Sequence, residues 1–262
     1  MTLIDTHCHL YVEEFRNDVE QVLSNARQAG VERIYLPAID STEHDVLLQL
    51  EQAHPEICIA MMGLHPCYVK ENYEEELRKV EDWLGRRKFA AVGEIGLDFY
   101  WDRNYDAQQY EAFRRQLELA KQYRIPVSIH SRNATLECIK EVKALQDGGL
   151  SGVFHCFSGS YELAKEVVKL GFYLGIGGVV TYKNGGLPEV LKHIPLEHIV
   201  LETDAPYLSP VPYRGKRNQP AYLTPITEKL SDIYGVSPEE IGAITTANAN
   251  RLFQYHPASI AK

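Results

Sequence analysis

Residues 3–9 read LIDTHCH, and this stretch connects the predicted fold with the predicted chemistry. A β-prone apolar start leads into Asp5, His7 and His9. In a β-strand, residues two apart point to the same side and lie roughly 6.5–7 Å apart. We therefore expect His7 and His9 to face one way and Cys8 the other. Two imidazoles at this spacing can bind one cation.

Seven further runs of the same kind follow along the chain, each short, apolar and rich in β-branched residues. The eight predicted strands cover residues 3–9, 33–38, 57–65, 89–97, 126–131, 152–157, 172–178 and 198–204. Strands buried on both faces, as in a parallel sheet covered by helices, have this composition. Amphipathic segments separate them. In residues 106–123, for example, Tyr110, Phe113 and Leu117 fall on one helical face.

This alternation of strands and helices predicts an α/β protein, a (β/α)8 TIM-type barrel with parallel strands. We expect one domain over residues 1–262, closed by two further helices around 221–234 and 237–253. A doubly wound open sheet is the main alternative. It is weakened because no GxGxxG motif follows the first predicted strand.

Composition limits where the protein works and what it binds. The chain has 36 acidic and 27 basic residues, a net charge of −9, which argues against broad coating of nucleic acid but leaves room for one local binding site. The five cysteines include no CxxC pair, and residues 1–10 do not resemble a signal peptide. We expect a soluble cytoplasmic protein with no membrane association and no obligate protein partner.

Ionisable residues lie near the carboxyl ends of several apolar runs. Burying even one such group without a partner costs several kcal/mol. A separate partner for each group is a less economical explanation than one shared metal centre. The six predicted ligands are His7, His9, Glu94, His130, His155 and Asp204.

Histidine nitrogens together with carboxylate oxygens favour zinc, manganese, iron or cobalt, whereas magnesium usually prefers oxygen ligands. Six ligands are too many for one tetrahedral catalytic zinc. Two metals about 3.5–4 Å apart, sharing a bridging carboxylate, fit better. We expect Glu94 to be the bridge and Asp204 to be both a ligand and the general base.

Several motifs that carry these residues resemble the TatD family of metal-dependent deoxyribonucleases, within the amidohydrolase-type barrel superfamily. The resemblance runs from about residue 2 to residue 254. The motifs are IDTHCHL (4–10), GLHP (63–66), GEIGLDFY (93–100), HSR (130–132), HCFSG (155–159), ETDAPYLSP (202–210) and PYRGKRNQP (212–220).

The resemblance implies a ligand set for each of two divalent ions, which we expect to be zinc, manganese or magnesium. His7, His9, Glu94 and Asp204 match the ligands of one ion; Glu94, His130 and His155 match those of the other. It also implies hydrolysis of DNA phosphodiester bonds, often from the 3′ end. Some relatives are described as deacylases of mischarged tRNA.

Other polar residues are candidates for substrate binding. His65 either lines the pocket or caps a turn before Pro66. The basic stretch of Arg214, Lys216 and Arg217 follows the last predicted strand and is expected to guide a phosphate backbone, rather than form only a solvated surface.

Three further groups each allow two roles. Glu202 either orients a metal-binding histidine or fills a layer of the barrel. Asp98 likewise either orients a metal-binding histidine or caps a loop. Tyr100 and Trp101 could stack on a base or belong to the core. The remaining histidines are expected at the surface: His44, His54, His193, His198 and His256.

We therefore predict a metal-dependent hydrolase, most simply a deoxyribonuclease acting 3′→5′ on single-stranded or frayed DNA ends. The metals activate water and stabilise charge, while Asp204 handles the proton. The second hypothesis is hydrolysis of a carboxylic ester or amide, including a D-aminoacyl ester on tRNA. A metal-dependent binding protein without turnover would lack a ligand or base, and none is missing.

Overall fold

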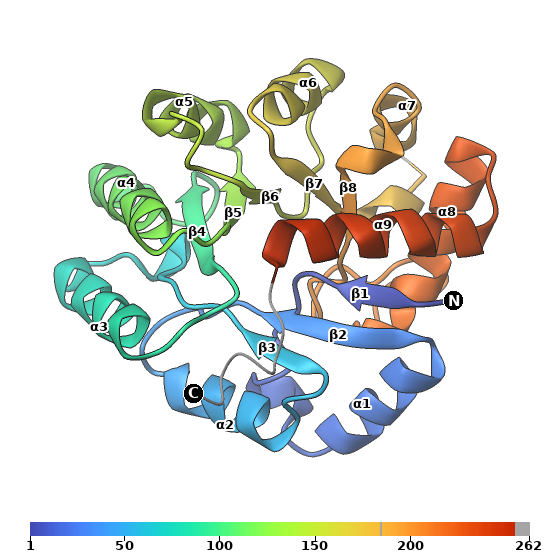
Figure 1. Ribbon diagram of the computed structural model, residues 1–262, viewed down its shortest axis with the longest axis horizontal. Coiled ribbons are helices and arrows are strands. Elements are labelled where there is room, and N and C mark those ends of the chain that lie inside the picture. The colour runs from blue at the N-terminus through green and yellow to red at the C-terminus, as the bar shows by residue number, and fades with distance from the viewer. Residues whose placement is uncertain (184, 255–262) are drawn as a thin grey trace.

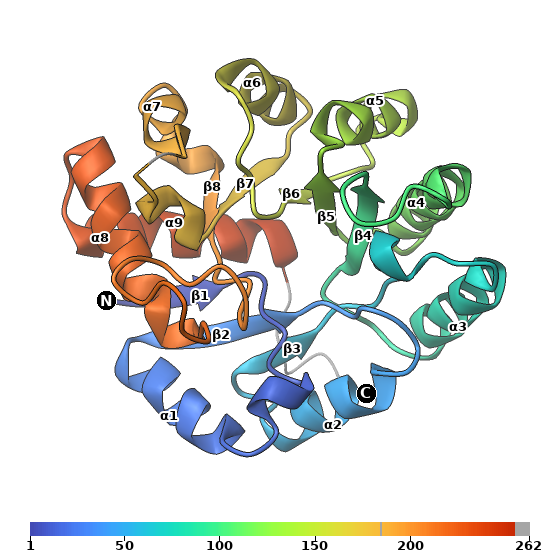
Figure 2. The same ribbon diagram turned by 180° about the vertical axis from the view of Figure 1, so that it is seen from behind.

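The computed structural model describes residues 1–183 and 185–254, and parallel strands surrounded by helices form its centre (Figures 1 and 2). The strands run β1 (Leu3–Asp5), β2 (Val31–Leu36), β3 (Cys58–Ala60), β4 (Val92–Asp98), β5 (Val127–Arg132), β6 (Gly152–Phe154), β7 (Tyr173–Ile176) and β8 (Ile199–Leu201). Their order along the chain is also their order around the ring, since each pairs with the next within two sheets, β1 to β3 and β4 to β8.

Two seams join these sheets edge to edge. Cys8 forms a parallel bridge with Ala205, beyond the ends of β1 and β8, and Met62 forms one with Val92, between β3 and β4. The Thr6 amide also donates to the Leu201 carbonyl at 2.9 Å. The protein therefore has the predicted α/β fold, a TIM-type barrel with parallel strands.

Helices follow the strands and form the outer layer, as the alternation predicts. They are α1 (Val19–Gln28), α2 (His44–Ala53), α3 (Tyr73–Arg86), α4 (Asp106–Tyr123), α5 (Thr135–Leu145), α6 (Tyr161–Lys169), α7 (Leu187–Leu191), α8 (Leu223–Tyr234) and α9 (Pro238–Phe253). Short 3-10 turns are η1 (Glu13–Phe15), η2 (Pro66–Tyr68), η3 (Gly178–Thr181), η4 (Leu196–His198) and η5 (Pro220–Tyr222). Within the described ranges, no helix is both long and apolar enough to cross a membrane.

Helix α9 closes the amino-terminal end of the barrel, where it lies across the strands in Figure 1. Phe253 stacks on Tyr35 with ring centroids 4.0 Å apart, within a small apolar cluster separate from the larger core around it. Asn248 donates to the carbonyls of Leu196 and Ile199, just before and at the start of β8. This end is filled, so the carboxyl ends of the strands remain for chemistry.

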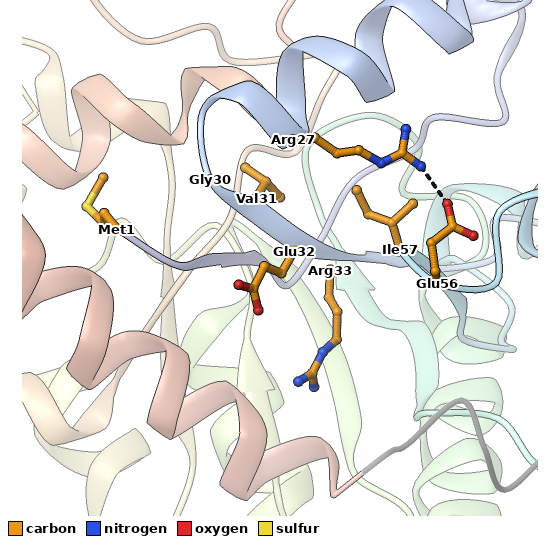
Figure 3. A pocket seen from close by; sticks show the side chains of 8 residues that line it. All are labelled: Met1, Arg27, Gly30, Val31, Glu32, Arg33, Glu56 and Ile57. Carbon is orange, nitrogen blue, oxygen red and sulfur yellow. Dashed lines mark hydrogen bonds and ion pairs between the residues drawn. The ribbon is translucent and has the colours of Figure 1, made fainter.

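A pocket does lie at the amino-terminal end, shown in Figure 3. The residues that line this pocket lie at the start of β2 and just before β3. Most of its charged side chains already form ion pairs or hydrogen bonds with other residues. Arg27 pairs with Glu56 at 2.5 Å, and Arg33 donates to Asn250 at 2.7 Å. Because the pocket lies at the amino-terminal ends of the strands, it is on the side of the barrel opposite to the predicted metal ligands.

Six predicted strands extend too far towards their carboxyl ends, namely those over 3–9, 33–38, 57–65, 152–157, 172–178 and 198–204. After β6 and β8 the chain turns sharply, which a regular ladder cannot follow: Cys156 and Asp204 have φ of 48° and 56°, in the left-handed region. His7 and His9 consequently lie beyond β1. The Cys8 bridge nevertheless keeps this segment extended, so both imidazoles still reach the same side.

The prediction that the remaining histidines are exposed is wrong for His44, which is 3% exposed. Glu76 of α3 accepts hydrogen bonds from the Ser41 amide and hydroxyl at 2.9 and 2.8 Å. These bonds hold the segment just before α2 against α3, and His44 is buried at the start of α2. Burial lowers the His44 pKa. His193 is exposed, whereas His54 and His198 are partly exposed; His256 lies outside the described residues.

Candidate metal centre

The carboxylate of Glu94, on β4, lies at the centre of the predicted ligands. One oxygen, Oε2, is 3.1 Å from His7 Nε2 and 3.5 Å from His9 Nε2. The other oxygen, Oε1, is 2.9 Å from His130 Nδ1 and 3.1 Å from His155 Nε2. The two oxygens therefore face two different pairs of imidazoles.

Asp204 completes the first of these groups. Its Oδ1 lies 3.6 Å from His9 Nε2 and 3.9 Å from His7 Nε2. Its backbone is left-handed, a conformation that aspartate tolerates better than most residues. The Asp204 amide donates to the His7 carbonyl at 2.9 Å, which fixes the carboxylate beside the first strand's imidazoles. All six predicted ligands therefore come together at the carboxyl ends of the strands.

The candidate metal centre is buried, and its carboxylates and imidazoles shift one another's pKa values. Burial alone would raise the pKa of Glu94, but the His65, His7 and His155 imidazoles hold it well below its usual range. Burial disfavours protonation of His9, yet its hydrogen bonds to Asp204 and Glu94 raise its pKa to about 9. The carboxylates that attract a proton here would equally attract a cation.

Partners on the outer side orient His9 and His155 in the same sense. Tyr11 donates its hydroxyl proton to the Pro37 carbonyl at 2.6 Å, so it accepts at 3.1 Å from His9 Nδ1–H. His155 Nδ1 is 3.2 Å from a Glu202 oxygen. In the neutral imidazole both arrangements keep the proton on Nδ1, so Nε2, which faces Glu94 or Asp204, can bind a metal in place of a second proton.

His130 is oriented in the opposite sense. Its Nε2 is 2.8 Å from Asp98 Oδ2, which leaves Nδ1 towards Glu94. His7 Nδ1 is 3.1 Å from the Ser128 hydroxyl, which can act as donor or acceptor. The nitrogen and oxygen atoms that face inwards match the donor set of a borderline divalent metal, so these residues fit such a group.

His65 lies in the same cluster but carries its proton differently. Its Nδ1 accepts from the Cys67 amide at 3.0 Å, so the proton of the neutral imidazole must be on Nε2. That N–H points to Glu94 Oε1 at 3.4 Å. In this tautomer His65 is a hydrogen-bond donor rather than a metal ligand, and it also caps the turn before η2.

Asp5, the acid in the opening motif, joins the strands instead of facing the metal centre. It accepts from the Thr203 amide at 2.9 Å and the Thr203 hydroxyl at 2.5 Å. Burial raises its pKa to about 8, although these bonds oppose the shift. Its position ties β1 to the segment that carries Asp204.

The basic stretch divides into different environments. The Arg217 guanidinium pairs with Asp18 at 2.6 Å and stacks on Phe15, which ties the stretch to the start of α1. The Arg214 guanidinium lies 3.9 Å from the centre of the Tyr182 ring. Arg214 and Lys216 line a shallow pocket after β8.

Sequence reasoning missed Tyr11 and Ser128. Each lies two residues from a predicted ligand, Tyr11 after His9 and Ser128 before His130, a spacing that places it on the ligand's side of an extended chain. That spacing is the signal that could have identified them. Glu202 and Asp98 were recognised, and each contacts a histidine.

The chain is similar to proteins of known family. The family model described as TatD related DNase matches residues 4–254. The uncharacterized metal-dependent hydrolase YabD of Bacillus subtilis is 39% identical over 253 residues, which cover 96% of this chain and 99% of that protein. The 3′-5′ ssDNA/RNA exonuclease TatD of Edwardsiella piscicida is 35% identical over 258 residues, which cover 96% and 99%.

A solved structure gives the same result. The TatD homologue YJJV of Escherichia coli K12 superposes with a TM-score of 0.91 at 33% identity, covering 97% of this chain and 98% of that one. A TIM-type barrel with these relatives and this cluster of histidines and carboxylates is a metal-dependent hydrolase. Within that class, the chain belongs to the TatD-related DNase family.

The orientation of His9 gives a test of the metal centre. Tyr11→Phe removes the acceptor of the His9 Nδ1 proton without touching an inward-facing atom. We expect metal affinity to fall roughly 10- to 100-fold, as is typical when such an outer partner is lost. Competition with a chromophoric chelator measures this. Tyr73→Phe, which removes a surface hydroxyl bonded to Glu111, is the matched control; equal affinity in both variants would contradict the assignment.

Proposed function

We propose that this chain is a deoxyribonuclease that uses two divalent metal ions to remove nucleotides from DNA ends in the 3′→5′ direction. The observation that supports a two-metal site is the arrangement of the Glu94 carboxylate, whose two oxygens face separate pairs of imidazoles. The direction of cleavage and the preference for single strands rest on the name of the Edwardsiella relative and on the family resemblance.

In this proposal His7, His9, Glu94 and Asp204 hold one ion, and Glu94, His130 and His155 hold the other, as the contacts of the two Glu94 oxygens and of Asp204 suggest. The ions are zinc, manganese or magnesium; imidazole donors favour the first two. When bound, they supply Lewis-acid stabilisation of phosphoryl charge and lower the pKa of a coordinated water. The chain's own part is to hold the imidazoles in the tautomers that its outer partners impose.

Asp204 is the proposed general base. Burial raises its pKa, but a hydrogen bond from His9 and the charges of His155 and His7 lower it overall, so the carboxylate is ionised at neutral pH. Its side chain is 14% exposed, against 3% for Glu94, so it is the more accessible of the two carboxylates. An ionised, accessible carboxylate can accept the proton of the attacking water.

Three further groups are proposed to bind the scissile phosphate and its neighbours. His65 Nε2–H is positioned to donate to a phosphoryl oxygen, because its other nitrogen is occupied by the Cys67 amide. Arg214 and Lys216, in the loop that follows Asp204, would supply positive charge to the substrate in a chain of net charge −9. The part of Arg217 is to hold this basic segment in place through Asp18.

The preference for ends follows from the recessed position of the centre. A rigid duplex cannot lower its interior phosphates to buried groups at a barrel mouth, whereas a terminal nucleotide can enter after unstacking. Unstacking costs a few kcal/mol and least when the strand is already unpaired.

Removing the bridge should affect both metal positions. For Glu94→Ala we expect metal analysis to find lower occupancy at both, because each group of imidazoles loses a carboxylate oxygen. Glu202 contacts His155 alone among the predicted ligands, so Glu202→Ala is the comparison and should weaken one position. Wild-type occupancy in Glu94→Ala would refute the bridge.

Removing the base should separate turnover from metal binding. Asp204→Asn keeps the size and one oxygen of the side chain, so we expect folding and at least one metal to be retained. Turnover should fall roughly 10²- to 10⁴-fold, as is typical for loss of a general base. Near-normal turnover at saturating metal would place the base elsewhere.

Digestion of DNA tests the proposed function itself. Stripped protein supplied with magnesium, manganese or zinc is incubated with end-labelled single-stranded DNA, either linear or closed into a circle. We expect the linear strand to shorten one nucleotide at a time from its 3′ end, while the circle resists. Rapid nicking of the circle would identify an endonuclease, and no cleavage of either substrate with any metal would overturn the nuclease assignment.

A further inference from the structure

Two large aromatic side chains stand in solvent just beyond β4. Trp101 is 67% exposed and Tyr100 is 53% exposed, and their rings lie edge to face with centroids 5.0 Å apart. Trp101 is the most exposed large apolar side chain among residues 1–183 and 185–254. The sequence left open whether this pair belongs to the core or contacts substrate, and the structure places it outside the core.

Arg132 joins the pair from the end of β5. Its guanidinium carbon lies 3.9 Å from the centre of the Tyr100 ring and 5.1 Å from that of Trp101. Within the described part of the chain, no carboxylate lies within ion-pairing distance of Arg132. These three side chains, which we call the Trp101 platform, therefore combine an open π-face with an uncompensated positive charge.

The platform is fixed to the metal centre through one carboxylate. Asp98 Oδ1 accepts from the amides of Tyr100 and Trp101 at 2.9 and 3.1 Å, while its Oδ2 contacts His130 Nε2 at 2.8 Å. Gln109 holds the Asp98 backbone by bonding both its amide and its carbonyl. The backbone that carries Tyr100 and Trp101 is therefore hydrogen-bonded to a carboxylate that also contacts a predicted metal ligand.

We infer that the Trp101 platform binds an unpaired nucleobase of a single-stranded substrate whose phosphate lies at the metal centre; this rests on the proposed nuclease function. The indole offers a flat face for stacking, and Arg132 offers a charge for the adjoining phosphate. The platform's side chains offer no buried hydrogen-bonding groups that would read base edges, so binding is independent of sequence. A paired base has both faces covered, so the platform favours single strands over duplex.

Stacking of one base on such an aromatic ring changes the dissociation constant by a factor that can be measured. With about 1.4 kcal/mol per tenfold, the usual gain for one stacked base corresponds to roughly 5- to 150-fold. Trp101→Ala should raise the dissociation constant by this factor, whereas Trp101→Phe, which keeps a π-face, should raise it much less. Leu136→Ala, which changes an exposed apolar side chain on α5, is the matched control and should leave it unchanged.

The test uses metal-loaded protein and a single-stranded oligothymidine with a phosphorothioate backbone, which is cut slowly. Fluorescence anisotropy gives affinity. The chain has two tryptophans, so in a Trp83→Phe background Trp101 alone reports stacking. We expect oligothymidine to quench this fluorescence and an abasic oligomer of equal charge not to. Arg132→Gln should reduce the salt dependence of binding by about one unit of slope.

The outcomes separate this inference from the nuclease assignment. Cleavage of DNA together with unchanged affinity in Trp101→Ala, or equal quenching by the abasic oligomer, overturns the platform and leaves the nuclease intact. Binding that depends on Trp101 without cleavage under any metal keeps the platform and overturns the nuclease. Absence of binding by the wild-type protein overturns the platform. Thermal unfolding confirms that each exposed-site variant is folded.

Discussion

The buried carboxylate of Glu94 is the constraint on which the rest of the structure depends. An ionised carboxylate away from water costs several kcal/mol unless other charges or hydrogen bonds compensate for it. Here the compensation comes from imidazoles that follow β1, β3 and β6 or lie on β5. Residues so distant in the chain meet only where parallel strands close into a ring, so the electrostatics of one side chain require the whole barrel.

Contacts to the outer nitrogens of the imidazoles determine which ring nitrogen faces the centre. Tyr11, Glu202 and Asp98 each hold the outer nitrogen of one imidazole and thereby decide which nitrogen faces inwards. The same logic sets His65 apart, because a backbone amide occupies its Nδ1 and leaves its proton on the inner side. Histidines of one cluster can thus divide between binding a cation and donating a hydrogen bond, without any difference in residue type.

The sequence was sufficient for the barrel and for the convergence of six ionisable residues, because apolar runs ending in such residues restrict the alternatives strongly. It was insufficient where the answer depends on contacts between distant elements. The burial of His44 depends on how the start of α2 meets α3, and the pairing of Arg217 with Asp18 depends on the course of a loop. Strand ends were misplaced because left-handed turns at Cys156 and Asp204 leave little trace in composition.

The seam between β8 and β1 has a consequence for how the protein matures. His7 and Asp204 lie on opposite sides of that seam, one near the start of the chain and one late in it. A nascent chain that has been synthesised only through β7 carries Glu94 and all the clustered imidazoles, yet it cannot complete the first group of ligands. Contacts this far apart in sequence form late in folding. A cation that binds only the finished arrangement would stabilise the closed ring by mass action, so the free energy of unfolding would rise with metal concentration.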